Sequence, residues 1–286
     1  MFQIFNNCYR LNAESISCDL IQRYLYNTTP RRVCITDTVY TENEKFFNPP
    51  FKKAIEAFFY NEFHKKFDIN RYGKYYIKYS PTITRQQVLD WTNKYRNIVF
   101  INDALPLSIS LGFYKRQEEN ELKYTRLGNI VHAIKYRGDK LRINALVNDV
   151  ATSISSFPYY KDADFICAIP PSKGKEFDLP TYIASKVSSE VSKPDISKYL
   201  VAGEKRQLKQ TSLDDKITEL SNWNISINTD IRGKTIILID DLYQSGSTMM
   251  YIAKKLQEAG AKYIYGLSIV KNLKNTDNCN SEGKYV

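Results

Sequence analysis

Cysteine and histidine are scarce in this sequence, and no Cys-x-x-Cys pair occurs. The two histidines, His64 and His132, lack the spacing of metal ligands, so the sequence predicts no structural zinc. The cysteines are odd in number and scattered, which predicts reduced thiols and no disulfide framework, as is typical of a cytoplasmic protein. They are Cys8, Cys18, Cys34, Cys167 and Cys279.

Long apolar runs are also missing. No stretch approaches the about 20 apolar residues that a membrane-spanning helix needs. The first residues lack the basic start and apolar core of a signal peptide. These absences favour a cytoplasmic protein without membrane contact.

Dense blocks of one charge are absent as well, although the chain is basic. Its 286 residues include 41 Lys and Arg against 31 Asp and Glu, a net charge of +10. The excess is spread along the chain, and no Lys/Arg block marks a nucleic-acid-binding arm. A basic balance still favours an anionic partner, either a phosphate-bearing small molecule or a nucleic acid. The hydrophobic fraction of 43% is enough for a folded core.

A break near residues 103–106 divides the chain into two predicted parts. Residues 1–104 form an N-terminal α/β region of unknown role, and residues 105–286 form a second α/β domain. For the first part the patterns predict strands at 33–36, 75–79 and 98–101, and helices at 48–67 and 84–95. Thr84 and Gln87 have the spacing of a capping box at the start of the second helix.

The second part alternates strands with helices, which predicts a parallel sheet flanked by helices. We expect a hairpin from residues 109–113 and 122–125, followed by one long helix over 127–153. Further strands are predicted at 165–169, 198–201, 235–241 and 263–270, and helices at 180–191 and 248–258.

The clearest chemical signal follows the buried strand at 236–239. Asp240 and Asp241 stand at its carboxyl end, where open α/β sheets bind ligands. A turn rich in small and hydroxyl-bearing residues comes next and leads into a helix, an arrangement that binds phosphate through backbone N–H groups and hydroxyls. Two carboxylates beside a phosphate site fit a phosphorylated sugar with Mg²⁺.

Two segments carry a family resemblance. Ile-Ile-Leu-Ile-Asp-Asp-Leu-Tyr-Gln-Ser-Gly-Ser-Thr, at 236–248, resembles the signature of type I phosphoribosyltransferases, whose ligand is 5-phosphoribosyl-1-pyrophosphate. Lys-Tyr-Arg-Gly-Asp, at 135–139, is similar to a segment of the ComF-like, competence-associated branch. The resemblance covers about residues 109–271 and implies the Rossmann-like fold of that family.

The resemblance also implies roles for individual residues. Asp240 and Asp241 would contact the ribose hydroxyls, bind Mg²⁺ directly or through the ligand or water, and stabilise charge at the anomeric carbon. The turn would hold the 5-phosphate; it consists of Leu242, Tyr243, Gln244, Ser245, Gly246, Ser247 and Thr248. The strand end and the pyrophosphate loop would supply Pro171, Ser172 and Lys175, and the flexible loop would supply Lys205, Arg206 and Lys209.

The sequence departs from the family pattern at several points. Glu176 stands where ComF-like proteins have glycine, and Gln244 stands where purine-type transferases have an acid, so a hypoxanthine or guanine acceptor is disfavoured. The N-terminal zinc ribbon of many ComF-like proteins is missing. We interpret the segment at 135–139, which begins with Lys135, as structural: it ends a helix turn and packs against the hairpin. We interpret the tyrosines and phenylalanines as mostly core residues.

Three hypotheses follow. The first is an enzyme that transfers a phosphoribosyl group to a nitrogen nucleophile. The second is a non-catalytic module that senses phosphoribosyl pyrophosphate or a nucleotide and signals through residues 1–104 to a protein partner. The third is an accessory role in a DNA-uptake or DNA-related system, with nucleic acid as an additional partner. A homodimer is compatible with all three.

Overall fold

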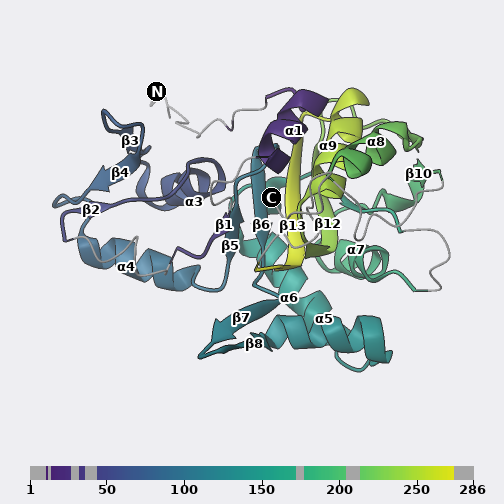
Figure 1. The fold of residues 1–286 in the computed structure, drawn as a ribbon, viewed down its shortest axis with the longest axis horizontal. Helices are drawn as coiled ribbons and strands as arrows, with labels where there is room; N and C mark the ends of the chain where they lie inside the picture. The colour runs from purple at the N-terminus through teal and green to yellow at the C-terminus, as the bar shows by residue number, and fades with distance from the viewer. Residues whose placement is uncertain are drawn as a thin grey trace, which may run out of the picture.

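The computed structural model describes residues 11, 14–26, 32–35, 44–171, 177–203 and 213–273. Their helices are α1 Cys18–Tyr26, α3 Lys53–Phe63, α4 Arg85–Lys94, α5 Arg126–Arg137, α6 Ile143–Ser156, α7 Leu179–Glu190, α8 Leu213–Asn222 and α9 Ser247–Glu258 (Figure 1). None of these helices is long and apolar enough to cross a membrane.

The central element is a six-stranded mixed sheet. Its strands, in spatial order, are β1 Arg32–Val33, β5 Val99–Ile101, β6 Leu107–Ser110, β13 Tyr263–Lys271, β12 Thr235–Tyr243 and β9 Phe165–Ala168. The last four run parallel, as predicted, whereas β5 pairs antiparallel with both of its neighbours. Because parallel strands are covered on both faces, the interior strand β12 has four successive buried residues.

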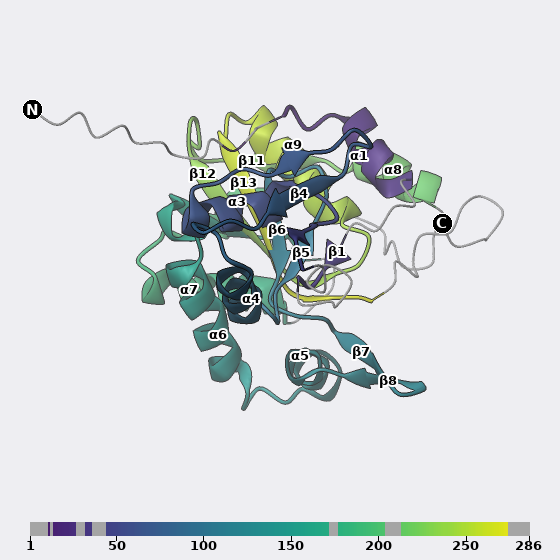
Figure 2. The ribbon, with the colours of Figure 1, turned by 90° about the vertical axis from the view of Figure 1, so that its left-hand side faces the viewer.

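Helices cover both faces of this sheet and make a three-layer α/β fold (Figures 1 and 2). One face packs against α3, α5, α6 and α7, with Ile237, Ile239 and Leu267 among its buried residues. The other packs against α1, α8 and α9, with Leu238 and Met250 among its buried residues. The fold class is therefore the α/β architecture that the sequence predicts.

The N-terminal region adds a small sheet and an aromatic core to this framework. The small sheet has the order β2 Phe46–Phe47, β4 Tyr75–Lys78 and β3 Asp68–Ile69. The predicted capping box forms at the start of α4, and the helix predicted over 48–67 is the shorter α3, with Ile55, Phe58 and Phe59 buried. Strands β1 and β5 join the central sheet, so hydrogen bonding continues across residue 104. The boundary at residue 104 stays a prediction.

Two predictions of local structure are wrong. The hairpin consists of β7 Lys115–Glu118 and β8 Glu121–Tyr124, because residues 107–110 pair with β13 in the central sheet instead. The predicted helix over 127–153 is two helices, α5 and α6. Gly138 ends α5 in the left-handed conformation with φ 66°, which residues with a side chain rarely adopt. A separate two-stranded antiparallel sheet, β10 Leu200–Ala202 with β11 Ile225–Ile227, completes the described part of the fold, and α8 lies between its strands in the sequence.

Candidate active site

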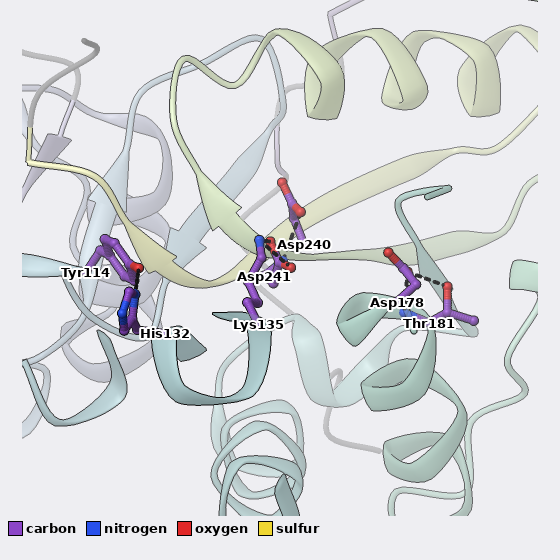
Figure 3. A network of polar contacts seen from close by, with 7 residues as sticks. All are labelled: Tyr114, His132, Lys135, Asp178, Thr181, Asp240 and Asp241. Carbon is purple, nitrogen blue, oxygen red and sulfur yellow. Dashed lines mark hydrogen bonds and ion pairs between the residues drawn. The ribbon is translucent and has the colours of Figure 1, made fainter. Parts of the chain in front are cut away.

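The two acidic residues stand at the carboxyl end of β12, as predicted. Successive side chains of a strand point to opposite faces of the sheet. Asp241 accordingly points towards α5, whereas Asp240 projects away from that helix (Figure 3). Asp241 is buried and Asp240 is half-buried. The two carboxyl groups therefore enclose the end of the strand from two sides.

Lys135 of α5 forms an ion pair with Asp241. Its ammonium lies 2.9 Å from both carboxylate oxygens (Figure 3). The side chains are 21% and 9% exposed, so water screens the pair only weakly. Burial disfavours the charged lysine, yet Asp241 outweighs this effect and raises the pKa of Lys135. The segment does end a helix at Arg137, as interpreted. The ion pair adds a contact with the acid pair that the interpretation did not include, and the structural role of Lys135 stays a prediction.

The pKa of the Asp240 carboxyl group is raised. Desolvation is the main cause, the negative charge of Asp241 adds to it, and Lys135 acts in the opposite direction; together they raise the pKa of Asp240 to about 7. The Asp240 carboxylate also accepts a hydrogen bond of 2.9 Å from the backbone N–H of Asp241. The strand end therefore presents one carboxyl group paired with lysine, that of Asp241, and one, that of Asp240, whose raised pKa lets it exchange a proton near neutral pH.

The predicted phosphate turn joins β12 to α9. The hydroxyls of Ser245 and Ser247 lie 3.1 Å apart and both residues are buried, whereas Thr248 is half-exposed. Gly246 has φ 81°, and a Cβ atom there would lie 1.9 Å from the hydroxyl oxygen of Tyr243. Only glycine fits, because both the backbone conformation and the neighbouring ring exclude a side chain. A phosphate bound at this turn would replace the contact between the two serine hydroxyls.

Lys271, at the end of β13, lies under the same turn. It is 2% exposed, and its ammonium donates hydrogen bonds of 2.8 Å to the carbonyl oxygens of Gln244 and Asn272. A buried positive charge at this position favours an anion bound at the turn. Lys271 is not among the predicted site residues, and the sequence signal that marks it is a lysine at the end of an apolar strand.

The remaining predicted site residues are partly described. Pro171 is exposed and follows β9, whose carboxyl end lies beside that of β12. Asp178 caps α7 by accepting hydrogen bonds from the backbone N–H and hydroxyl of Thr181, and its charge contributes to the raised pKa of Asp240. Five predicted residues lie outside the described residues: Ser172, Lys175, Lys205, Arg206 and Lys209.

Aromatic side chains gather on the hairpin and on α5, next to the acid pair. The hydroxyls of Tyr114 and Tyr124 lie 3.0 and 3.2 Å from Nδ1 of His132, and the His132 ring is 4.9 Å from that of Tyr136. Tyr124 is 38% exposed and Tyr136 is 58% exposed. Our interpretation of the tyrosines as mostly core residues is wrong for these two, which present rings to solvent.

The fit of this site to Mg²⁺ depends on the ligand. Carboxylate oxygens are the donors that Mg²⁺ prefers. However, Asp241 is already paired with Lys135, and among the described residues no group of three potential ligands is close enough together to hold a metal. The residues therefore fit a Mg²⁺ ion whose remaining coordination positions are filled by oxygens of the ligand and by water. They do not fit a Mg²⁺ ion coordinated by protein groups alone.

The chain is similar to one known competence protein over part of its length. No family model matches. Competence protein ComFC of Bacillus subtilis (strain 168) is 30% identical over 127 residues, which are 44% of this chain and 51% of that protein. The chain resembles the ComF-like branch of the type I phosphoribosyltransferases. It spans about half the length of this curated relative.

Solved phosphoribosyltransferases are more distant. The purine phosphoribosyltransferase of Pyrococcus horikoshii Ot3 is 13% identical, with 46% of this chain and 85% of that chain covered and a TM-score of 0.32. The adenine phosphoribosyltransferase of Leishmania tarentolae is 9% identical, with 57% and 91% covered and a TM-score of 0.37. These TM-scores are too low to support an argument, so the fold class rests on the strand order and the flanking helices.

Proposed function

We propose that the carboxyl end of β12 binds 5-phosphoribosyl-1-pyrophosphate and that the protein transfers its phosphoribosyl group to a nitrogen nucleophile. The observation that carries this proposal is the position of Asp240 and Asp241 directly before a turn that opens α9. The start of α9 and the charge of Lys271 favour the 5-phosphate there. The acid pair is then placed to accept hydrogen bonds from the ribose hydroxyls.

The reaction replaces one bond at the anomeric carbon by another. The bond from C1 to the pyrophosphate oxygen breaks, the nitrogen nucleophile forms the new bond to C1, and its proton leaves to a base or to water. Positive charge develops on the ribose ring, and the carboxylate of Asp241 stabilises it. Lys135 is released from Asp241 and balances the negative charge of the pyrophosphate. If Mg²⁺ were held by oxygens of the ligand with the help of Asp240 and Asp241, it would further neutralise the charge of the leaving pyrophosphate.

Release of pyrophosphate tests this function. The full chain is incubated with phosphoribosyl pyrophosphate, Mg²⁺ and a panel of nitrogen bases. We expect release with at least one base and a loss of about 100-fold or more in Asp241→Asn, because the ionised carboxylate is lost. Asp230→Asn is the matched control, since Asp230 is an exposed residue that pairs with nearby Arg232. Release with no base would contradict the enzymatic proposal.

A non-catalytic sensor is the second candidate, favoured by a specific observation. Gln244 offers an amide where purine-type transferases place an acid, and an amide does not take up a proton at neutral pH. In this case the ligand stabilises the folded protein without turnover. A rise in melting temperature with phosphoribosyl pyrophosphate, combined with no pyrophosphate release, identifies the sensor.

A DNA-related role is the third candidate. It is supported by the net charge of +10 and by the name of the ComFC relative. Binding to phosphates releases counterions, so genuine DNA binding weakens steeply as salt increases. Titration of single- and double-stranded DNA at several salt concentrations tests this role; absence of binding at low salt contradicts it.

A further inference from the structure

A buried carboxylate outside the family motif contacts the phosphate turn. Asp103 lies between β5 and β6 and is completely buried. Its carboxylate accepts a hydrogen bond of 2.8 Å from the hydroxyl of Tyr243 and one of 3.0 Å from the backbone N–H of Leu105. Burial raises the pKa of Asp103, and Lys53 together with these hydrogen bonds opposes the rise. Such a group is costly to bury, so its partners need to be held in place.

The partners of Asp103 extend into the N-terminal region. Lys53 is the first residue of α3, and its ammonium donates a hydrogen bond to the backbone carbonyl of Asp103. The same ammonium lies 4.4 Å from the ring centroid of Tyr24 in α1. Burial lowers the pKa of Lys53, and Asp103 counteracts this effect. The Lys53 ammonium therefore links α1 and α3 to the connection between β5 and β6.

On its other side the network ends at the turn. The ring of Tyr243 fills the space beside Gly246 where a side chain would lie. Gly246 in turn accepts the hydrogen bond from the backbone N–H of Met250, at 2.9 Å, that begins α9. The Tyr243 hydroxyl therefore lies directly against the turn at the point where the helix begins.

We propose that Asp103 and Lys53 are positioning residues for the phosphate turn, acting through the hydroxyl of Tyr243. By this account the N-terminal region completes the anion site without touching the ligand. This proposal rests on the proposed function in one respect: the ligand of the turn carries a phosphate group. It assigns to the N-terminal region a role that the motif alone does not supply.

Tyr243→Phe is the direct test, because it removes only the hydroxyl. Backbone hydrogen exchange of residues 245–248 is measured first, since it needs no ligand. We expect exchange about tenfold faster, as loss of a hydrogen bond to a carboxylate implies. Affinity for phosphoribosyl pyrophosphate with Mg²⁺, and for inorganic phosphate, falls by a similar factor. Tyr160→Phe is the matched control, since the hydroxyl of Tyr160 is buried and donates a hydrogen bond of 2.8 Å to Gly266.

Lys53→Met tests the distant end of the network and serves as the second variant if Tyr243→Phe does not fold. Lys53 belongs to another element, so a purely local role would leave exchange at 245–248 unchanged. We expect faster exchange there, with Lys53→Arg restoring most of the protection. Lys65→Met is the control, because Lys65 pairs with Asp68 at 3.4 Å and the two side chains are 47% and 44% exposed.

The outcomes separate the two proposals. Faster exchange at the turn in Tyr243→Phe and Lys53→Met, but not in Tyr160→Phe or Lys65→Met, supports the positioning role. If the wild type then binds no phosphate ligand, only the proposed function is overturned. The positioning role is overturned if Tyr243→Phe and Tyr160→Phe show the same hydrogen exchange at residues 245–248 and the same phosphate affinity. This holds whether or not the wild type binds phosphoribosyl pyrophosphate.

Discussion

At the scale of single residues, the ion pair of Lys135 and Asp241 is the feature with the largest consequence. Replacing Lys135 by methionine leaves a carboxylate buried without its cation, which is more costly than losing both charges. We expect Lys135→Met to lower the free energy of unfolding by about 2 kcal/mol, and the double variant with Asp241→Asn to recover most of that loss. Urea unfolding of the four proteins measures this coupling.

The surface pair of Lys94 and Glu62 provides the control for that cycle. Its side chains are 56% and 41% exposed, and the two charges lie 3.0 Å apart. Exposed pairs contribute about 0 to 1 kcal/mol, so Lys94→Met changes stability little. A coupling between Lys135 and Asp241 no larger than that of the surface pair would show that their contact is incidental.

Asp240 makes the stability of the protein depend on pH. Its pKa is raised from 3.8 to about 7, so the folded protein binds the proton more tightly than the unfolded chain does. This contribution is therefore complete below about pH 4 and is lost as the pH rises through about 7. We expect this contribution to be on the order of 4 kcal/mol, since a pKa difference of one is worth about 1.4 kcal/mol, and to be absent from Asp240→Asn. Chemical unfolding of both proteins between about pH 4 and about pH 8 measures the difference, and a difference that does not change with pH would contradict the assignment.

At the scale of elements, the unit of β12, turn and α9 depends on Gly246. Gly246→Ala introduces an unfavourable φ and a clash with Tyr243, whereas Gly73→Ala introduces only the unfavourable φ, since nothing lies within 4 Å of a Cβ there. We expect Gly73→Ala to cost about 1 kcal/mol and Gly246→Ala about 3 kcal/mol or more. Thermal unfolding compares them, and equal losses would show that the Tyr243 ring does not restrict this position.

The elements were largely predictable, whereas the contacts between them were not. Apolar runs predict β9, β12 and β13 within one or two residues, because their burial on both faces leaves a continuous hydrophobic pattern. The division of the long helix at Gly138 was missed because hydrophobic spacing continues into α6. The sequence does not reveal the contacts of Lys135, Lys271 and Asp103, because their partners are distant along the chain. Lys135 and Asp241, for example, are 106 residues apart. A pattern along the chain contains no such information.

At the scale of the whole molecule, a single sheet crosses the predicted boundary at residue 104. Trp91 lies in the N-terminal region and Trp223 in the second part, and both are buried. We expect their fluorescence to report one common unfolding transition. Phe58→Ala removes a ring whose centroid lies 5.2 Å from that of Phe100. We expect it to lower the free energy of unfolding by about 3 to 5 kcal/mol and to shift the unfolding transition reported by Trp223 fluorescence as well. Separate transitions for the two tryptophans would instead indicate independent domains, and Trp91→Phe isolates the signal of Trp223.

The central claim is that the end of β12 and the turn before α9 form a site for a phosphorylated ribose. Calorimetric titration of phosphoribosyl pyrophosphate with Mg²⁺ into the full chain tests it most directly. The account predicts saturable binding at one site per chain, weakened at least tenfold by Asp241→Asn and unaffected by Asp230→Asn. Absence of heat that saturates, or binding that Asp241→Asn leaves unchanged, would contradict it.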